Sequence, residues 1–218
     1  MEQSNSHRIF LEIFCEGSRK FGWTFSEKVL DLFWCFYREL CLWENVVNLT
    51  GLKYEREKIV LLFLDSLNAQ SFIAEKACNR IVDIGTGAGF PGIPLQIVYP
   101  DKQVYLVEAK AKKVAFLLNV VGKLNLYGTS VIQQRIEDIA KKEAFNEKLD
   151  MAMIKGVNVS HITPYLNKIL HKDGKLMVFR SENSDVTCAN NEMMKCKDFS
   201  YELPFGFGKR TIELLEFR

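Results

Sequence analysis

The spacing of hydrophobic residues along the chain changes near residue 79. Before that point, apolar side chains recur every three or four residues, which is typical of helices with one buried face. The pattern predicts helices around residues 9–14, over Ser26–Trp43 and over Glu55–Ala74. The Ser26 hydroxyl can cap the second of these helices. We therefore expect a helical cap over residues 1–76.

Beyond residue 79, short β-branched runs alternate with helical patterns. Strands are predicted at RIVDI, QVYLVE, SVIQQ, LDMAMI and GKLMVFR, with helices between them. This alternation is typical of βαβ units with right-handed crossovers in a parallel sheet. The last two runs, SYELPF and RTIELLEF, are joined by GFGK and predict an antiparallel hairpin. The fold class expected over residues 77–218 is α/β, with a Rossmann-like, mostly parallel sheet and a C-terminal hairpin.

Composition narrows the class of protein only a little. The chain has 218 residues, is 48% hydrophobic and carries a formal net charge of +2. This balance is ordinary for a globular protein, and a near-neutral charge leaves a local basic patch as the only electrostatic sign of nucleic-acid binding. The six cysteines form neither a Cys-x-x-Cys pair nor a cluster with histidine, so no metal site is predicted. The longest apolar run, Ile59–Leu64, is too short to cross a bilayer, and we expect a cytoplasmic monomer.

The glycine-rich segment DIGTGAGFPG follows the first predicted strand, where ligands bind in open parallel sheets. A nucleoside-triphosphate loop requires G-x-x-x-x-G-K-[ST]. Gly87 and Gly92 have that spacing, but Ile93 and Pro94 follow them. Without the lysine and the hydroxyl group, such a loop holds neither phosphates nor Mg²⁺, so this type of site is set aside.

A dinucleotide loop requires G-x-G-x-x-G. Gly85 and Gly87 fit, but Phe90 occupies the position of the third glycine. Asp83, at the end of the strand, would also repel a pyrophosphate. A dehydrogenase is therefore a weaker alternative.

S-adenosylmethionine fits the loop better, because this ligand has no pyrophosphate and carries a sulfonium and an ammonium group. Asp83 suits its cationic end, directly or through water. Gly85, Gly87 and Gly89 allow the backbone to approach the ligand closely. Glu108 ends the second strand, where a carboxylate can hold ribose hydroxyls. Glu108 alone would fit either nucleoside cofactor.

VDIGTGAGFPGIPLQIVYPD and LVEAKAKKVAFLLNVVGKLNL resemble the ribosomal RNA small subunit methyltransferase G family, also called glucose-inhibited division protein B. LWENVVNLTGL, FLDSL and QQRIEDI resemble further segments of that family. The resemblance implies a class I methyltransferase sheet with a helical cap, and methyl transfer to N7 of a guanine in 16S rRNA. It also implies site residues, with Gly85, Phe90 and Glu108 at the cofactor, Ile136 and Glu137 along the adenine, and Lys155 beside the pocket.

The acceptor chemistry can be considered from the residues themselves. No proline precedes a cysteine, as a pyrimidine C5 methyltransferase would require, and KGVNV follows the fourth strand in place of a Pro-Pro-aromatic motif. Guanine N7 has an available lone pair and loses no proton, so positioning can supply most of the catalysis. Lys155 and Arg180 end the fourth and fifth strands and can contact a phosphate or the guanine O6 edge.

The sequence departs from the family pattern at three places. Leu61-Leu62 stands where the family has Arg-His, Lys155-Gly156 where it has Arg-Ala, and Arg180-Ser181 where it has Lys-Gly. The first change removes two polar groups from the cap. An alternative function therefore stays open: an S-adenosylmethionine-binding protein with weak or altered activity that acts through RNA or partner binding.

Overall fold

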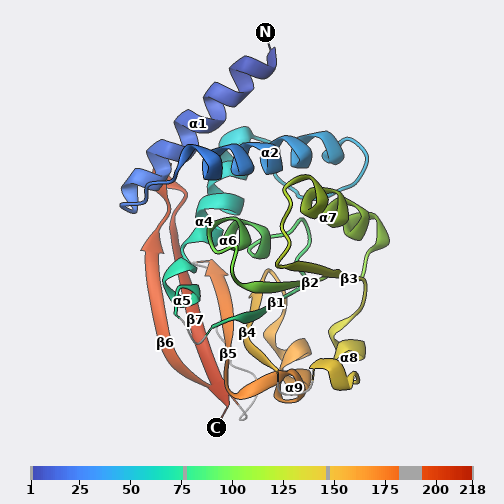
Figure 1. Cartoon of the computed structure of the whole chain (residues 1–218). Helices are drawn as coiled ribbons and strands as arrows, with labels where there is room; N and C mark the ends of the chain where they lie inside the picture. The colour runs from blue at the N-terminus through green and yellow to red at the C-terminus, as the bar shows by residue number, and fades with distance from the viewer. Residues whose placement is uncertain (1, 76–77, 146–147, 182–192, 218) are drawn as a thin grey trace.

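The structure, a computed structural model, describes residues 2–75, 78–145, 148–181 and 193–217. Its centre is one seven-stranded sheet in the order β3-β2-β1-β4-β5-β7-β6 (Figure 1). The first five strands are parallel, whereas β7 runs antiparallel to both β5 and β6. The strands are β1 (Arg80–Ile84), β2 (Gln103–Val107), β3 (Thr129–Ile132), β4 (Leu149–Lys155), β5 (Leu170–Ser181), β6 (Met193–Glu202) and β7 (Lys209–Phe217). The predicted fold class, including the final hairpin, is confirmed.

Helices cover both faces of the sheet (Figure 1). On the side of the N-terminal helices lie α6 (Gly92–Val98) and α7 (Ala111–Lys123). On the other side lie α8 (Ile136–Ile139) and α9 (Val159–Ile169). The helix predicted between the strands SVIQQ and LDMAMI, over the segment IEDIAKKEAF, is shorter than expected, because α8 ends after one turn and is followed by a separate 3-10 turn, η2 (Glu143–Phe145).

The N-terminal region begins with α1 (Glu2–Lys20) and α2 (Glu27–Glu44). Ser26 caps α2 as predicted, since its hydroxyl oxygen accepts a hydrogen bond from Val29 N. The single helix expected over Glu55–Ala74 is instead broken into α3 (Glu55–Lys58), the π-helix η1 (Ile59–Leu64), α4 (Asp65–Leu67) and α5 (Gln70–Ile73). No helix within the described ranges is both long and apolar enough to cross a membrane.

The break has a local cause. The side chains of Ser66 and Asn68 donate to the carbonyl oxygens of Leu62 and Leu64, four residues earlier. These bonds compete with the regular backbone ladder. The result is a widened turn that brings Asp65 and the carbonyl of Leu61 to the edge of the sheet, where they meet the end of β4.

One aromatic core joins the N-terminal helices to the sheet. Phe36 of α2 stacks on Phe90 with ring centroids 4.9 Å apart, and Phe63 of η1 meets Phe90 edge-on at 5.0 Å. All three rings are buried, and such pairs favour these offset and edge-on geometries. The helices are therefore packed directly above the glycine loop. The division into 1–76 and 77–218 stays a prediction, because its boundary falls outside the described residues.

Candidate active site

The loop between β1 and α6 holds three glycines in a left-handed backbone conformation. Their φ angles are +69° at Gly85, +61° at Gly87 and +87° at Gly89, a region that favours glycine. Gly85 and Gly87 line a cleft. A Cβ atom on Gly89 would instead overlap the side chain of Ile93. The first two glycines therefore leave room in the cleft, and the third lets the loop pack closely on α6.

Asp83 lies beneath this loop and is completely buried. Its Oδ2 accepts hydrogen bonds from Thr86 Oγ1 at 2.7 Å and from Gly92 N at 2.8 Å. Its Oδ1 has no hydrogen-bond partner within the described residues. Burial raises the pKa of Asp83 to about 6, although the two hydrogen bonds favour the ionised form. Asp83 thus shapes the loop from below, and its expected contact with a cationic ligand stays a prediction.

Gly92 takes the role that sequence reasoning assigned to the position of Phe90. A Cβ atom on Gly92 would overlap Leu106 and would lie 2.9 Å from Asp83 Oδ2. Only glycine therefore lets α6 begin so close to the sheet. The glycine that a dinucleotide loop has at the position of Phe90 is thus found two residues later, at Gly92, and Phe90 lines the cleft while it anchors the N-terminal helices. The signal was present in the sequence as GFPG.

Glu108 lies at the end of β2, as predicted, and is 8% exposed. Its Oε2 accepts from Gly87 N at 3.1 Å, and its Oε1 accepts from Lys110 N at 2.9 Å. The carboxylate thereby ties the glycine loop to the start of α7. Its expected contact with a ribose stays a prediction.

A cleft of about 500 Å³ opens above Gly85 and Gly87. One wall comes from the segment 49–52 and from Leu61 and Leu62 of the π-helix. Leu61 and Leu62, where the family pattern has Arg-His, therefore give this wall an apolar surface. The other wall comes from the ends of β4 and β7, including Lys155 and Arg210. Sequence reasoning placed Arg210 in the hairpin but did not place it at this cleft.

Lys155 is held by the N-terminal helices. Its Nζ donates to the Leu61 carbonyl oxygen at 2.7 Å and pairs with Asp65 Oδ2 at 2.7 Å. The other carboxylate oxygen of Asp65 accepts from the Tyr201 hydroxyl at 2.7 Å. Burial and the adjacent Asp65 carboxylate raise the pKa of Tyr201, so its hydroxyl stays protonated. Asp65 and Tyr201 are residues that sequence reasoning missed; FLDSL contained Asp65, but no pattern linked it to Tyr201.

Arg180 lies in an adjoining hollow of about 370 Å³, which also reaches Lys155, Gly156 and Arg210. Its Nε donates to Glu213 Oε2 at 3.1 Å, and both side chains are largely buried. Its Nη2 has no hydrogen-bond partner in the described part of the chain. Lys155 and Arg180 are thus brought to one region, and each is already paired with a carboxylate.

Ile136 and Glu137 are not brought into the cleft that Gly85 lines. Ile136 is buried in the second hydrophobic core, on the face of the sheet covered by α8 and α9. Glu137 follows it in the first turn of α8 and is partly exposed. Their expected positions along an adenine stay predictions. Within the described residues, no group of three or more His, Cys, Asp or Glu side chains could hold a metal ion.

Comparison with known proteins decides the family. A family model described as rRNA small subunit methyltransferase G, or GidB, matches residues 30–212, which is most of the chain. The chain belongs to the rRNA small subunit methyltransferase G family. The resemblance predicted from the glycine loop is thereby confirmed.

Two relatives named ribosomal RNA small subunit methyltransferase G illustrate how far the similarity extends. The protein of Caldanaerobacter subterraneus subsp. tengcongensis is 34% identical over 195 residues, covering 88% of this chain and 79% of the relative. That of Carboxydothermus hydrogenoformans is 33% identical over 201 residues, covering 88% and 85%. The similarity to methyltransferase G proteins therefore extends into the N-terminal helical region as well as over the sheet.

Solved structures confirm the fold of this methyltransferase G family member. A SAM-dependent methyltransferase from Aquifex aeolicus is similar with a TM-score of 0.53 at 15% identity, covering 74% of this chain and 93% of that one. TYW2 from M. jannaschii, solved in complex with AdoMet, is similar with a TM-score of 0.50 at 14% identity, covering 71% and 77%. At such identities the likeness concerns the fold alone, and the fold is that of methyltransferases.

Proposed function

We propose that this chain transfers a methyl group from S-adenosylmethionine to N7 of a guanine in the 16S rRNA of the small ribosomal subunit. The observation that carries the proposal is the cleft over Gly85 and Gly87 in a chain that belongs to the methyltransferase G family. The predicted enzyme class, methyltransferase, follows from that membership.

The residues present fit S-adenosylmethionine. The left-handed glycines leave the backbone bare toward the cleft, and Gly85 approaches Val157 so closely that a Cβ atom would lie 2.8 Å from its Cγ2. Two carboxylates, Asp83 and Glu108, lie at or beneath this loop and favour a cationic ligand over a pyrophosphate. S-adenosylmethionine supplies an electrophilic methyl group when it is bound. Gly85, Gly87 and Phe90 would form its cradle, and Gly89 would hold the loop against α6 behind them.

The proposed reaction requires no proton transfer by a side chain of the cleft. Guanine N7 attacks with a lone pair that carries no proton, so no general base is needed. The work of the side chains is to position the base and to exclude water. Leu61, Leu62 and Phe90 supply an apolar surface for a flat base. Exclusion of water by this wall strengthens any polar contact that the base makes inside.

Lys155 is the residue we propose to touch the guanine. A lysine ammonium has three N–H donors, and the structure shows two of them directed at Leu61 O and Asp65. The third can donate to guanine O6, which lies next to N7. Asp65 lowers the net charge of the site, so Lys155 acts as an oriented donor rather than as an isolated cation. Arg180, steadied by Glu213, is proposed to contact a phosphate from the adjoining hollow.

The acceptor in this proposal is 16S rRNA, free or in the small subunit, and the protein works as a cytoplasmic monomer. Ile136 and Glu137 would flank the adenine once α8 and the glycine loop hold the cofactor between them. No metal ion takes part in the proposed reaction.

A second candidate is an S-adenosylmethionine-binding protein of weak or altered activity that acts through RNA or partner binding. Two observations favour it. Leu61 and Leu62 make the cap wall apolar, and Lys155 and Arg180 are both paired with buried carboxylates. A site with few free polar groups binds a ligand more readily than it discriminates between bases.

Transfer of labelled methyl groups separates the two candidates. The chain is incubated with methyl-labelled S-adenosylmethionine and either 16S rRNA or small subunits from a strain that lacks the modification. The proposal expects label in one of these RNAs and none in large-subunit rRNA. Cofactor binding by calorimetry without any transfer would support the second candidate and contradict the first.

A further inference from the structure

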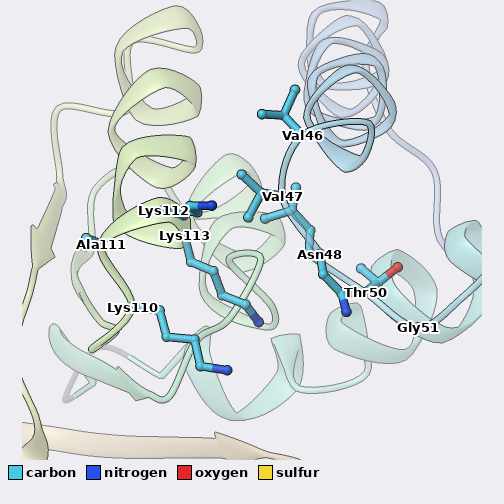
Figure 2. Close-up of a pocket in the computed structure, with 10 residues that line it drawn as sticks. Val46, Val47, Asn48, Thr50, Gly51, Lys110, Ala111, Lys112 and Lys113 are labelled. Atoms are coloured by element: carbon cyan, nitrogen blue, oxygen red, sulfur yellow. The ribbon is translucent and has the colours of Figure 1, made fainter.

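A second hollow, of about 610 Å³, lies between residues 46–51 and the start of α7 (Figure 2). We call it the lysine hollow, after Lys110, Lys112 and Lys113, which line it. Figure 2 shows Lys110, Lys113 and Asn48 extending into the space between the two segments. Part of the wall is apolar, with Val46 77% exposed.

The charged side chains that line this hollow are all positive. Its described lining includes no acidic residue, and no ion pair is found for any of its three lysines within the described part of the chain. The nearby Glu44 accepts a hydrogen bond from Thr50, which lines the hollow, but its charge is paired with that of Lys58. Glu108 is buried near the base of this surface, where its carboxylate accepts from the backbone N–H groups of Gly87 and Lys110. Three lysines without an ion pair in the described part of the chain, gathered in one concave surface, attract anions, and the positive end of the α7 dipole adds to the field.

A hollow at the opposite end of the parallel strands, beside the starts of β4 and β5, shows the contrast. It holds Lys172 and Lys175, but four acidic residues line it with them. These acids are Glu75, Asp150, Asp173 and Glu216. Lysines that share a hollow with acidic residues give no net positive field. The lysine hollow therefore differs from this second hollow in having a net positive lining.

The lysine hollow is continuous with the methyl-transfer cleft. Leu49, Thr50, Gly51 and Lys113 line both. The Nζ of Lys113 lies 3.6 Å from the position of a Cβ atom on Gly87, so this side chain reaches over the glycine loop. A polymer whose base occupies the cleft would therefore lay its neighbouring backbone in the lysine hollow.

From this geometry we propose that the lysine hollow binds the phosphodiester backbone of the RNA strand that flanks the target guanine, with Lys110 and Lys112 as the phosphate contacts. Asn48 lies beside them as an uncharged donor. The inference rests on the proposed function and deepens it, since it assigns the surface that orients the acceptor. Lysine ammonium groups contact phosphates without reading bases, so this surface contributes affinity and register rather than sequence preference.

The double variant K110Q/K112Q tests the proposal, because both side chains are exposed and glutamine keeps most of their length. The matched control, K172Q/K175Q, removes two lysines from the opposite hollow. K110R/K112R, which keeps the charge, is expected to behave as wild type. RNA affinity is measured by fluorescence anisotropy with 16S rRNA across a series of KCl concentrations, and S-adenosylmethionine affinity by calorimetry.

Loss of two phosphate contacts is expected to weaken RNA binding roughly 10- to 30-fold near 0.1 M salt and to reduce the slope of log K against log[salt] by about 1.4. S-adenosylmethionine affinity is expected to stay at the wild-type value. The control K172Q/K175Q should keep the wild-type affinity for both RNA and S-adenosylmethionine. Unchanged RNA affinity, or an equal loss in K172Q/K175Q, would overturn the proposal.

A fall in S-adenosylmethionine affinity for K110Q/K112Q would also overturn it, because the hollow would then serve the carboxylate of the methyl donor. Failure of the proposed function would be recognised by a different result, because the wild-type chain would then transfer no methyl group to RNA. If the wild type transfers methyl groups and K110Q/K112Q binds RNA equally well, only the role of the lysine hollow fails.

Discussion

Asp83 shows how a single buried residue can hold a ligand-binding loop from beneath, while its contact with the cofactor stays a prediction. One of its oxygens holds Thr86 and the start of α6, while the other is buried without a partner within the described residues. The sequence placed an acid at the end of the first strand, and we expected it at the cationic end of the cofactor. Its hydrogen bonds point inward because Gly92 brings a backbone N–H within 2.8 Å, a contact that depends on tertiary packing.

Asp83 predicts a pH dependence of stability. Its pKa in the folded chain, about 6, lies above the ordinary value of 3.8 for an aspartate, so the folded chain binds more protons between these values. The wild type therefore loses unfolding free energy, through this group, as pH rises from about 4 to about 6. Asp83→Asn lacks the titration and accepts the same two hydrogen bonds. The difference in unfolding free energy, variant minus wild type, is expected to rise across this window in urea titrations. Parallel curves would contradict the assigned pKa.

Gly85 offers a test of the cofactor loop. Gly85→Asp places a side chain and a negative charge in the cleft, and we expect S-adenosylmethionine affinity to fall at least tenfold, about 1.4 kcal/mol. Gly22→Asp is the matched control, because its φ of +74° is similar while nothing lies within 4 Å of its Cβ position. Calorimetry measures affinity, and thermal melting checks that both variants fold. Wild-type affinity in Gly85→Asp would show that the loop was assigned wrongly.

At the scale of elements, the contact between the π-helix and the end of β4 organises the site. The widened turn presents the carbonyl of Leu61 and the buried carboxylate of Asp65 to the end of β4, and Lys155 binds both. The alternation of strands and helices was predictable from hydrophobic spacing alone. The break in the helix after Lys58 was not, because the spacing of apolar residues there stays helical and the competing bonds come from Ser66 and Asn68.

This contact predicts non-additive stability changes. Lys155→Met leaves Asp65 buried without its cation, and we expect a loss of about 2–4 kcal/mol in unfolding free energy. In the double variant with Asp65→Asn, the loss should be smaller than the sum of the single losses by at least about 1 kcal/mol. Lys141→Met is the control, since its pair with Asp138 is exposed and the expected loss is below about 0.5 kcal/mol. Additive losses at Lys155 and Asp65 in denaturant titrations would refute the coupling.

On the scale of the whole molecule, the site is assembled from segments far apart in the chain. Asp65 and Tyr201 are separated by 136 positions, and the hairpin adds Arg210 to the cleft. The sequence predicted the glycine loop, because its chemistry is local to one turn. It could not predict which cations are neutralised, since Glu213 and Asp65 reach Arg180 and Lys155 only through strand pairing and cap packing. The net charge of +2 gives no sign of the lysine hollow, whose three lysines follow the second strand as a local run in the sequence.

The central claim concerns the atom that receives the methyl group. The most direct measurement incubates the wild-type chain with labelled S-adenosylmethionine and unmodified small-subunit rRNA, then maps the product by strand cleavage specific for N7-methylguanine and by mass spectrometry of nucleosides. We predict 7-methylguanosine at a single position of 16S rRNA, and none with Gly85→Asp. Label on another base, on another atom of guanine, or on no RNA despite measurable cofactor binding would contradict the claim.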